Sequence, residues 1–280
     1  LWLGGLLVAV CAASGEAMPE TQHMSVSVLG RQAFVYKPQA HLASSVGPLA
    51  GIFVLHGSGF APTDMYGLGF EHFADINNFL VVYPEMKVPR GDTWDFTDDI
   101  PFFSALYERL QEDDFRLDRS RAFVCGHSAG GTMALFLQNQ MDAFSAAAAV
   151  EAAVAFLNQW DMSRQGHRTM VVWNHADPVL HQYAPEGNER AYYNITISVL
   201  RRHGSMQPSK TKRLPTSGTA VFAELQFYCQ DTAPELLVLE WRSDPGIHAW
   251  PRSSQFGFDA TEEMMKFFNM RTVGATVIYS

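Results

Sequence analysis

The stretch that decides the fold is Ala122-Phe123-Val124-Cys125-Gly126-His127-Ser128-Ala129-Gly130-Gly131. It begins as a short apolar strand, turns at the first glycine, and continues into a segment with the apolar spacing of a helix. A strand that turns abruptly into a helix holds the residue at the turn in strained backbone angles, and side chains two positions before and after it would collide. Glycines occupy both of those positions. The pattern therefore predicts a nucleophile elbow, with Ser128 raised at the carboxyl edge of a sheet.

Apolar segments bounded by turn residues alternate with helical patterns along the rest of the chain. The expected strands are 25–29, 32–36, 51–55, 79–83, 122–125, 145–150, 169–173 and 235–241, and the expected helices are 99–110, 129–141, 190–202 and 259–270. Uninterrupted apolar strands are what a parallel sheet covered on both faces requires. The alternation predicts one α/β domain over residues 24–270, a doubly wound and mostly parallel sheet with helices on both faces. We interpret the polar, basic segment 204–219 as a surface excursion and 271–280 as a C-terminal tail.

The composition excludes several classes of protein. The chain has 280 residues, of which 47% are hydrophobic and 18% charged, so it can form a large core and is not globally disordered. Its net charge of −9 argues against a nucleic-acid partner. No apolar run reaches the roughly 18 residues typical of a membrane span. Three cysteines without a Cys-x-x-Cys pair argue against a disulfide scaffold or a structural zinc site. Cys125 and Cys229 are either two buried thiols or one bridge.

Residues 1–13 carry no charge and have the character of the apolar region of a secretory signal peptide. Small residues follow, and residues 15–17 offer a cleavage site. We therefore predict that 1–17 is a signal peptide, truncated at its start, and that the protein is secreted or periplasmic. A lipoprotein anchor at Cys11 and a buried N-terminal strand are the alternatives.

Asp177 is the predicted acidic partner of Ser128. In this kind of sheet the partners follow in the order Ser, acid, His. Asp177 comes shortly after the strand at 169–173 and precedes Pro178, which biases it toward an extended backbone. Such a carboxylate is placed to reach an imidazole from the end of a strand. Asp161, Asp231 and Asp244 are weaker candidates. None of them comes directly at the end of an apolar strand with a loop leading on to the histidine.

His248 is the predicted base. It lies on the loop that follows the last expected strand, 235–241, which is where the final partner belongs. A neutral imidazole there can take the serine proton, while the acid holds its orientation. His203 lies in a polar loop and His181 follows the acid too closely, so neither is preferred.

The loop His56-Gly57-Ser58-Gly59 follows the strand at 51–55 and is predicted to complete an oxyanion hole. Its glycines let the backbone approach a substrate closely. We assign the two donors to the backbone N–H groups of Ser58 and Ala129, with any of residues 57–59 able to supply the first. His56 is expected to brace the loop.

Three tryptophans near these loops are candidate substrate-binding residues. Trp94, Trp173 and Trp250 could form an aromatic wall, and Trp250 is the strongest candidate because it follows the base by two positions. Packing in the core is the alternative for each ring.

Several motifs occur in order over most of residues 32–268. They are Tyr36-Lys37-Pro38, Leu55-His56-Gly57-Ser58-Gly59, Val82-Tyr83-Pro84-Glu85, Asp98-Asp99-Ile100, Gly126-His127-Ser128-Ala129-Gly130-Gly131, Ala176-Asp177-Pro178-Val179, His248-Ala249-Trp250-Pro251 and Phe258-Asp259-Ala260-Thr261. On these motifs the chain resembles the secreted α/β-hydrolase esterases that group polyhydroxybutyrate depolymerases with feruloyl and acetylxylan esterases. The resemblance implies an α/β-hydrolase fold, an exported esterase, and Ser128, Asp177 and His248 as its triad. One departure is Asn174-His175, where the family usually has His-Gly.

The expected function is hydrolysis of a carboxylic ester, small or polymer-linked, by a Ser-His-Asp triad. This chemistry needs no metal and no cofactor. The alternatives are a peptidase or lipase on the same fold, and a catalytically silent binding protein. The natural ester and the oligomeric state stay open.

Overall fold

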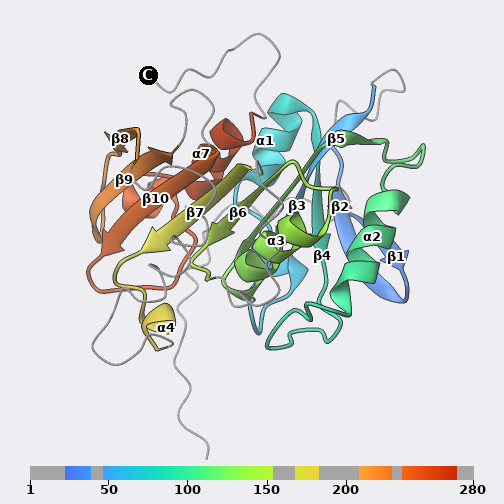
Figure 1. Cartoon of the computed structure of the whole chain (residues 1–280), viewed down its shortest axis with the longest axis horizontal. Coiled ribbons are helices and arrows are strands. Elements are labelled where there is room, and N and C mark those ends of the chain that lie inside the picture. Colours follow the sequence, from blue (N-terminus) through green and yellow to red (C-terminus); the bar gives the residue numbers. More distant parts are fainter. Residues whose placement is uncertain (1–22, 39–46, 154–167, 183–207, 229–234, 270–280) are drawn as a thin grey trace, which may run out of the picture.

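The computed structural model describes residues 23–38, 47–153, 168–182, 208–228 and 235–269. Within these residues the chain forms a ten-stranded sheet, in the order β1-β2-β4-β3-β5-β6-β7-β10-β9-β8 (Figure 1). The strands are β1 (His23–Val28), β2 (Arg31–Tyr36), β3 (Leu49–Leu55), β4 (Phe79–Pro84), β5 (Leu117–His127), β6 (Ala146–Val150), β7 (Arg168–Asn174), β8 (Lys210–Arg213), β9 (Ala220–Tyr228) and β10 (Leu236–Ser243). Every strand expected from the sequence is present.

The centre of the sheet is parallel and its two sides are antiparallel. Strands β4, β3, β5, β6, β7 and β10 run parallel to one another, whereas β1 and β2 on one side and β9 and β8 on the other form antiparallel pairs. The predicted mostly parallel sheet is confirmed. The carboxyl ends of β3, β5, β7 and β10 therefore meet at one edge, which is where the predicted site residues follow their strands.

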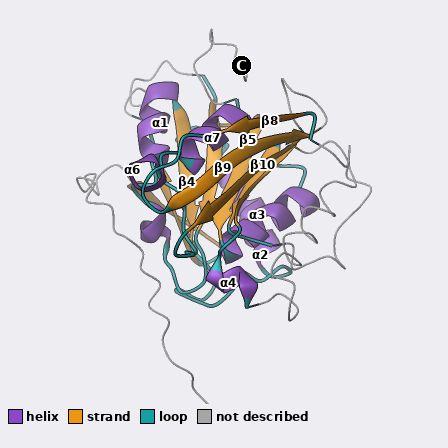
Figure 2. Ribbon diagram, turned by 90° about the vertical axis from the view of Figure 1, so that its left-hand side faces the viewer, coloured by secondary structure: helices purple, strands orange, loops and turns teal. Residues whose placement is uncertain are grey.

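Helices cover both faces, as predicted (Figures 1 and 2). On one face α1 (Phe70–Asn77), α6 (Ser253–Phe256) and α7 (Ala260–Phe267) contribute to one apolar cluster with the sheet. On the other, α2 (Asp99–Arg109) and α3 (Ala129–Gln140) contribute to a second. The short elements η3 (Pro62–Met65) and α4 (Pro178–His181) lie in the loops after β3 and β7.

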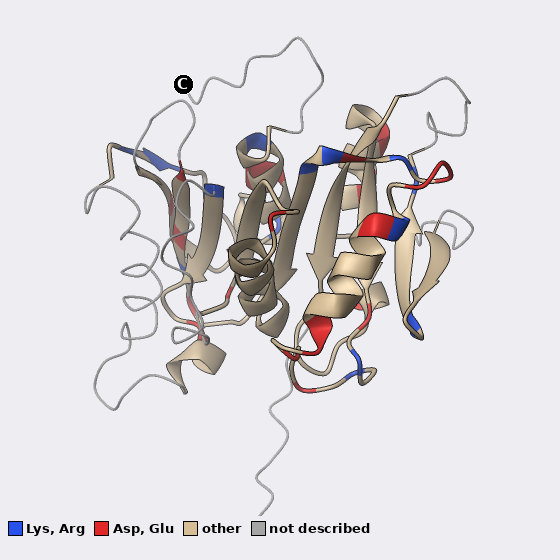
Figure 3. Cartoon of the chain, turned by 45° about the vertical axis from the view of Figure 1, so that its right-hand side comes forward, with Lys and Arg blue, Asp and Glu red and all other residues tan. Residues whose placement is uncertain are grey.

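The composition of the central elements explains their burial. All six residues of β4 and all five of β6 are buried, as expected for strands covered on both faces. Helix α3 carries no charged residue, and Figure 3 shows charges gathered on other helices, on loops and on strand ends instead. Burying a large apolar side chain contributes about 1.5–3 kcal/mol, so these elements stabilise the sheet beneath the loops strongly.

The structure adds elements that the sequence analysis did not predict, among them the nine-residue strand β9. Strand β8 lies inside the segment 204–219 that was expected to be a surface excursion, and it pairs with β9. Its residues are mostly exposed and basic because it is an edge strand, and charged edges of this kind protect a sheet from pairing with other chains. Helix α1 was also not predicted, because its eight residues bury few apolar side chains.

Several predictions fall on residues outside the described ranges. They concern the signal peptide at 1–17, the helix at 190–202, the tail at 271–280, and Cys229 as a partner for Cys125. Among the described residues Cys125 is a buried free thiol. In the same part of the chain no helix has both the length and the apolar character needed to cross a bilayer.

Candidate active site

The turn between β5 and α3 has the strained geometry that the sequence predicted. Ser128 has φ 55° and ψ −122°, a backbone conformation that L residues rarely adopt. A Cβ added to Gly126 would lie 2.4 Å from the carbonyl carbon of Gly130, and one added to Gly130 would lie 2.3 Å from the carbonyl oxygen of Leu55. The predicted collisions are confirmed. The serine is held at the N-terminus of α3, at the carboxyl edge of the sheet.

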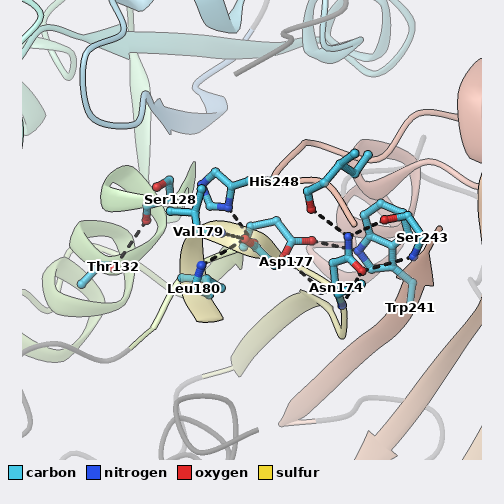
Figure 4. Close-up of polar contacts among 12 residues, drawn as sticks. Ser128, Thr132, Asn174, Asp177, Val179, Leu180, Trp241, Ser243 and His248 are labelled. Atoms are coloured by element: carbon cyan, nitrogen blue, oxygen red, sulfur yellow. Dashed lines mark hydrogen bonds and ion pairs between the residues drawn. The ribbon is translucent and has the colours of Figure 1, made fainter. Parts of the chain in front are cut away.

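His248 and Asp177 form a buried pair beside this serine. The Nδ1 of His248 lies 2.6 Å from Oδ2 of Asp177, and Figure 4 shows the imidazole between Ser128 and Asp177. The other carboxylate oxygen of Asp177 accepts hydrogen bonds from the backbone N–H groups of Val179 (2.8 Å) and Leu180 (3.1 Å), so the aspartate also caps α4. The carboxylate is fully buried and its orientation is fixed from both sides.

The second ring nitrogen of His248, Nε2, is available to accept a proton. Because Nδ1 donates to Asp177, the neutral ring presents Nε2 as an acceptor. This atom is buried and has no hydrogen-bond partner among the described residues. In that part of the chain, the Ser128 hydroxyl does not donate a hydrogen bond to Nε2 of His248. Hydrogen bonds between a nucleophile and its base are often long before a substrate binds.

Burial and hydrogen bonding set the charges of this site. Burial acts to raise the pKa of Asp177, but the hydrogen bond and charge of His248, with further hydrogen bonds from Glu151 and Leu180, hold that pKa below its ordinary value. The neighbouring His127 is only 8% exposed, and its ring centroid lies 4.7 Å from that of His248. Burial, followed by the proximity of His248, lowers the pKa of His127 to about 3. Asp177 is therefore ionised and His127 neutral near neutral pH.

Asn174, at the end of β7, links the loops that carry the acid and the base. Its Nδ2 donates to the carbonyl of Ile247 (2.8 Å) and to Oγ of Ser243 (2.9 Å), and its Oδ1 accepts from the N–H of Ala176 (3.0 Å). These bonds fix the residue before His248 relative to the residue before Asp177. A glycine or a smaller side chain here would leave both loops less constrained.

The loop after β3 lies against the serine. A Cβ on Gly57 would lie 3.2 Å from Cβ of Ser128, so the backbone approaches the site closely there. The N–H of Gly59 donates to the carbonyl of Gly91 (2.9 Å), which removes Gly59 as an oxyanion donor. Gly57 and Ser58 remain, together with Ala129 at the start of α3.

His56 braces this loop, as expected. Its Nδ1 lies 3.0 Å from the carbonyl oxygen of Gly57, and its Nε2 accepts from the N–H of Met86 (3.4 Å). Burial lowers the pKa of His56, so the ring is neutral and can make both contacts.

The structure places the three predicted substrate-binding tryptophans in the core. Trp250 is 7% exposed, donates its indole N–H to Thr261 Oγ1 (3.0 Å), and packs edge-on against Phe70. Trp94 donates to the carbonyl of His56 (3.0 Å), and Trp173 is buried within the sheet. Packing accounts for these positions, and a contact with substrate stays a prediction.

Sequence reasoning missed Glu151. It is fully buried at the carboxyl end of β6, between the strands that carry the serine and the aspartate. A single acidic residue directly after the apolar run 146–150 was the signal that could have found it. Among the described residues no group of His, Cys, Asp and Glu side chains is arranged to hold a metal ion.

A strained serine turn on a parallel sheet, with helices on both faces, defines the α/β-hydrolase fold, and the chain is a hydrolase of the serine esterase and peptidase superfamily. The profile of the prolyl oligopeptidase family matches residues 93–269, which is more than half of the chain. The chain belongs to that family. No curated protein sequence matches it.

One solved structure shows the same fold over nearly its whole length, and two others superpose less closely. The acetyl xylan esterase from Aspergillus awamori superposes with a TM-score of 0.65 at 16% identity, over 89% of this chain and 99% of that one. A carboxylesterase from Mesorhizobium loti gives 0.48 at 17% identity, over 65% and 86% of the two chains. A ferulic acid esterase gives 0.48 at 15% identity, over 63% and 84%. The predicted resemblance to α/β-hydrolase esterases is confirmed at the level of the fold.

Proposed function

We propose that this protein is a serine hydrolase of carboxylic esters, with Ser128 as nucleophile, His248 as base and Asp177 as the acid that orients the base. The observation that carries the proposal is the buried bond of 2.6 Å between His248 and Asp177, next to a serine held at positive φ. Backbone strain of this kind persists only where the surrounding structure enforces it, and it clusters at active sites.

In the first step the Ser128 oxygen attacks the ester carbonyl carbon. His248 Nε2 takes the hydroxyl proton, and the negative charge of Asp177 stabilises the imidazolium that forms. The carbonyl oxygen becomes an oxyanion, which accepts hydrogen bonds from the backbone N–H groups of Ala129 and of Gly57 or Ser58. The N-terminal end of α3 adds a partial positive charge there. His248 then returns its proton to the leaving alcohol.

In the second step water repeats the sequence on the acyl-enzyme. His248 removes a proton from the water, the hydroxide attacks the ester carbon, and the proton returns to Ser128 as the acid product leaves. The neutral state of His127 supports this cycle, since a second cation beside His248 would oppose formation of the imidazolium.

The substrate class we favour is an acetyl or feruloyl ester of a polysaccharide, with hydroxybutyrate polyesters as the further member of the predicted group. Two observations support this class. The superposition on an acetyl xylan esterase covers nearly the whole of both chains, and the sequence motifs resemble those of the same group. A peptidase is the second candidate, and membership of the prolyl oligopeptidase family favours it. We place the ester first because of the extent of the superposition on the acetyl xylan esterase.

A fluorophosphonate probe tests the nucleophile, and a substrate panel tests the class. Wild-type protein should label and Ser128→Ala should not, while Ser25→Ala, an exposed serine on β1, should label like wild type. The panel would hold p-nitrophenyl acetate and butyrate, methyl ferulate, acetylated xylan, hydroxybutyrate oligomers and prolyl p-nitroanilides. Labelling of Ser128→Ala would refute the assignment, and turnover of anilides alone would favour the peptidase.

We also propose that the protein is exported, on the apolar, uncharged character of residues 1–13. Mass spectrometry of the protein recovered from culture medium or periplasm should find an N-terminus near residue 18. Recovery of residues 1–17 on the protein from the cytoplasm alone would contradict this.

A further inference from the structure

Glu151 is a fully buried acid in an unusual backbone conformation. Its φ is 48°, in the left-handed region, and its N–H donates to the carbonyl of Val172 on β7 (2.9 Å). Outside glycine such a conformation is uncommon and has an energetic cost, so local packing must hold it. The residue is therefore placed firmly, at the end of the strand that separates β5 from β7.

Its side chain is held by hydrogen bonds from two strands. Trp241 on β10 donates its indole N–H to Oε1 (2.8 Å), and the backbone N–H of Asn174 on β7 donates to Oε2 (3.0 Å). The carboxyl group of Glu151 also makes a side-chain hydrogen bond with that of Asp177. The glutamate thus contacts the acid of the triad directly.

A hydrogen bond between two carboxyl groups requires one proton. Within the described residues neither group is paired with a Lys or Arg, and the ion-pair partner of Asp177 is His248. Two adjacent buried carboxylates would repel each other strongly, so only one of them ionises. Burial, followed by the charge and hydrogen bond of Asp177, raises the pKa of Glu151 well above its ordinary value. Because Asp177 is held ionised by His248, the proton resides on Glu151.

We propose that Glu151 is a positioning residue, whose protonated carboxyl group donates a hydrogen bond to the Asp177 carboxylate and holds it against His248. The inference rests on the proposed function, because it concerns the same triad. The two N–H donors fix the rotation of the Glu151 side chain, so its proton is directed at one acceptor. Asp177 then receives hydrogen bonds from Glu151, from His248 and from the backbone of α4, which leaves its carboxylate a single orientation.

Three variants test the role through kinetics. Glu151→Gln keeps a neutral donor toward Asp177, but its amide nitrogen cannot accept one of the two N–H bonds that the carboxyl group receives. We therefore expect kcat to fall by less than about tenfold, and the acid limb of the pH–rate profile to move by less than about half a pH unit. Glu151→Leu removes the donor, and kcat should fall about tenfold to hundredfold while KM stays within about twofold, the cost of losing one hydrogen bond to a charged group. Glu71→Gln is the matched control, because Glu71 is buried on α1 and bonded to Tyr83, and it should behave like wild type.

Two kinetic outcomes would overturn the inference. If Glu151 were ionised, Glu151→Gln would remove a negative charge near the imidazole and lower the acid limb by about one unit or more. Loss of activity in Glu151→Gln as large as in Glu151→Leu would also refute a role for the donated proton. If the leucine variant does not fold, the glutamine variant still decides the question.

A measurement that needs no turnover separates this inference from the proposed function. Carboxyl carbon NMR, with the Glu151 signal assigned by its loss in Glu151→Gln, should show a protonated group at neutral pH. Titration of that signal near the ordinary value of about 4.3 would overturn the inference even in an active enzyme. A protonated Glu151 in a protein that no fluorophosphonate labels would leave the carboxyl pair standing and refute the proposed function alone.

Discussion

Acidification should destabilise this protein, and His127 should account for a defined share of the loss. The ring is buried beside His248 and its pKa is lowered to about 3, below the value of about 6.5 for a histidine in an unfolded chain. Between these two values the unfolded state binds one proton more than the folded state. The contribution of His127 to stability is therefore complete above about pH 6.5 and is lost progressively as the pH falls toward 3.

The size of the effect follows from linkage. One extra proton in the unfolded state lowers the free energy of unfolding by about 1.4 kcal/mol for each pH unit. Between pH 7 and pH 4.5 the loss due to His127 is about 2.5 kcal/mol. The figure is set mainly by the unfolded value, because pH 4.5 lies above the lowered pKa of the folded state.

The assay is urea unfolding of wild type and His127→Gln at half-unit steps from pH 7 to pH 4.5. The variant keeps a neutral polar side chain but cannot take up the proton, so its free energy of unfolding should decline by about 2.5 kcal/mol less than that of wild type over the range. Contributions from the carboxylates and from His56 are common to both proteins and cancel in the comparison. Parallel curves, differing by less than about 0.5 kcal/mol over the range, would refute the reasoning.

Three further variants test the site. Gly130→Ala would bring a Cβ within 2.3 Å of the Leu55 carbonyl oxygen, so the free energy of unfolding should fall by about 1–3 kcal/mol or more in urea, and an unchanged midpoint would contradict the turn geometry. Asn174→Ala removes the amide that donates to the carbonyl of Ile247, so kcat should fall about tenfold with the melting temperature measured alongside, and full activity would show that the loops need no such link. Asp177→Asn should lower kcat about 10⁴-fold in ester hydrolysis, because the amide no longer stabilises the imidazolium, and a loss below about tenfold would argue against this acid.

The central sheet could be predicted because its strands carry their own signal. Phe79–Pro84 and Ala146–Val150 are apolar at every position and buried on both faces, so pattern and environment agree. Lys210–Arg213 could not be found in this way. An edge strand buries little, and its pairing is decided by the partner strand rather than by its own side chains.

Ser128 could be predicted because the chemistry demands a local pattern, in which the glycines relieve collisions within one turn. Asp177 and His248 could be predicted from the order of the strands along the chain. Glu151 and Trp250 depend instead on three-dimensional packing. The position of Glu151 beside the triad follows only from the order of the strands in the sheet, where β6 lies between β5 and β7. The direction of the Trp250 ring depends on the path of a loop.

The backbone of the sheet sets the spacing of the catalytic groups. At the carboxyl edge, the first residue after each of β5, β6 and β7 donates its backbone N–H to a carbonyl group of the next strand in the sheet. These bonds are Ser128 to Val150 (2.8 Å), Glu151 to Val172 (2.9 Å) and His175 to Trp241 (2.8 Å). Neighbouring strands in a sheet are about 4.8 Å apart, and the interval hardly varies with sequence. Main-chain hydrogen bonds therefore position Ser128 and Glu151 directly, and Asp177 through His175, which precedes it by two residues. The base, which must accept and release a proton in each cycle, is the one member carried on a longer loop, and Asn174 connects that loop to the same edge through Ile247. Substitutions elsewhere in the loops should therefore alter substrate preference, measured as KM, before they alter the triad.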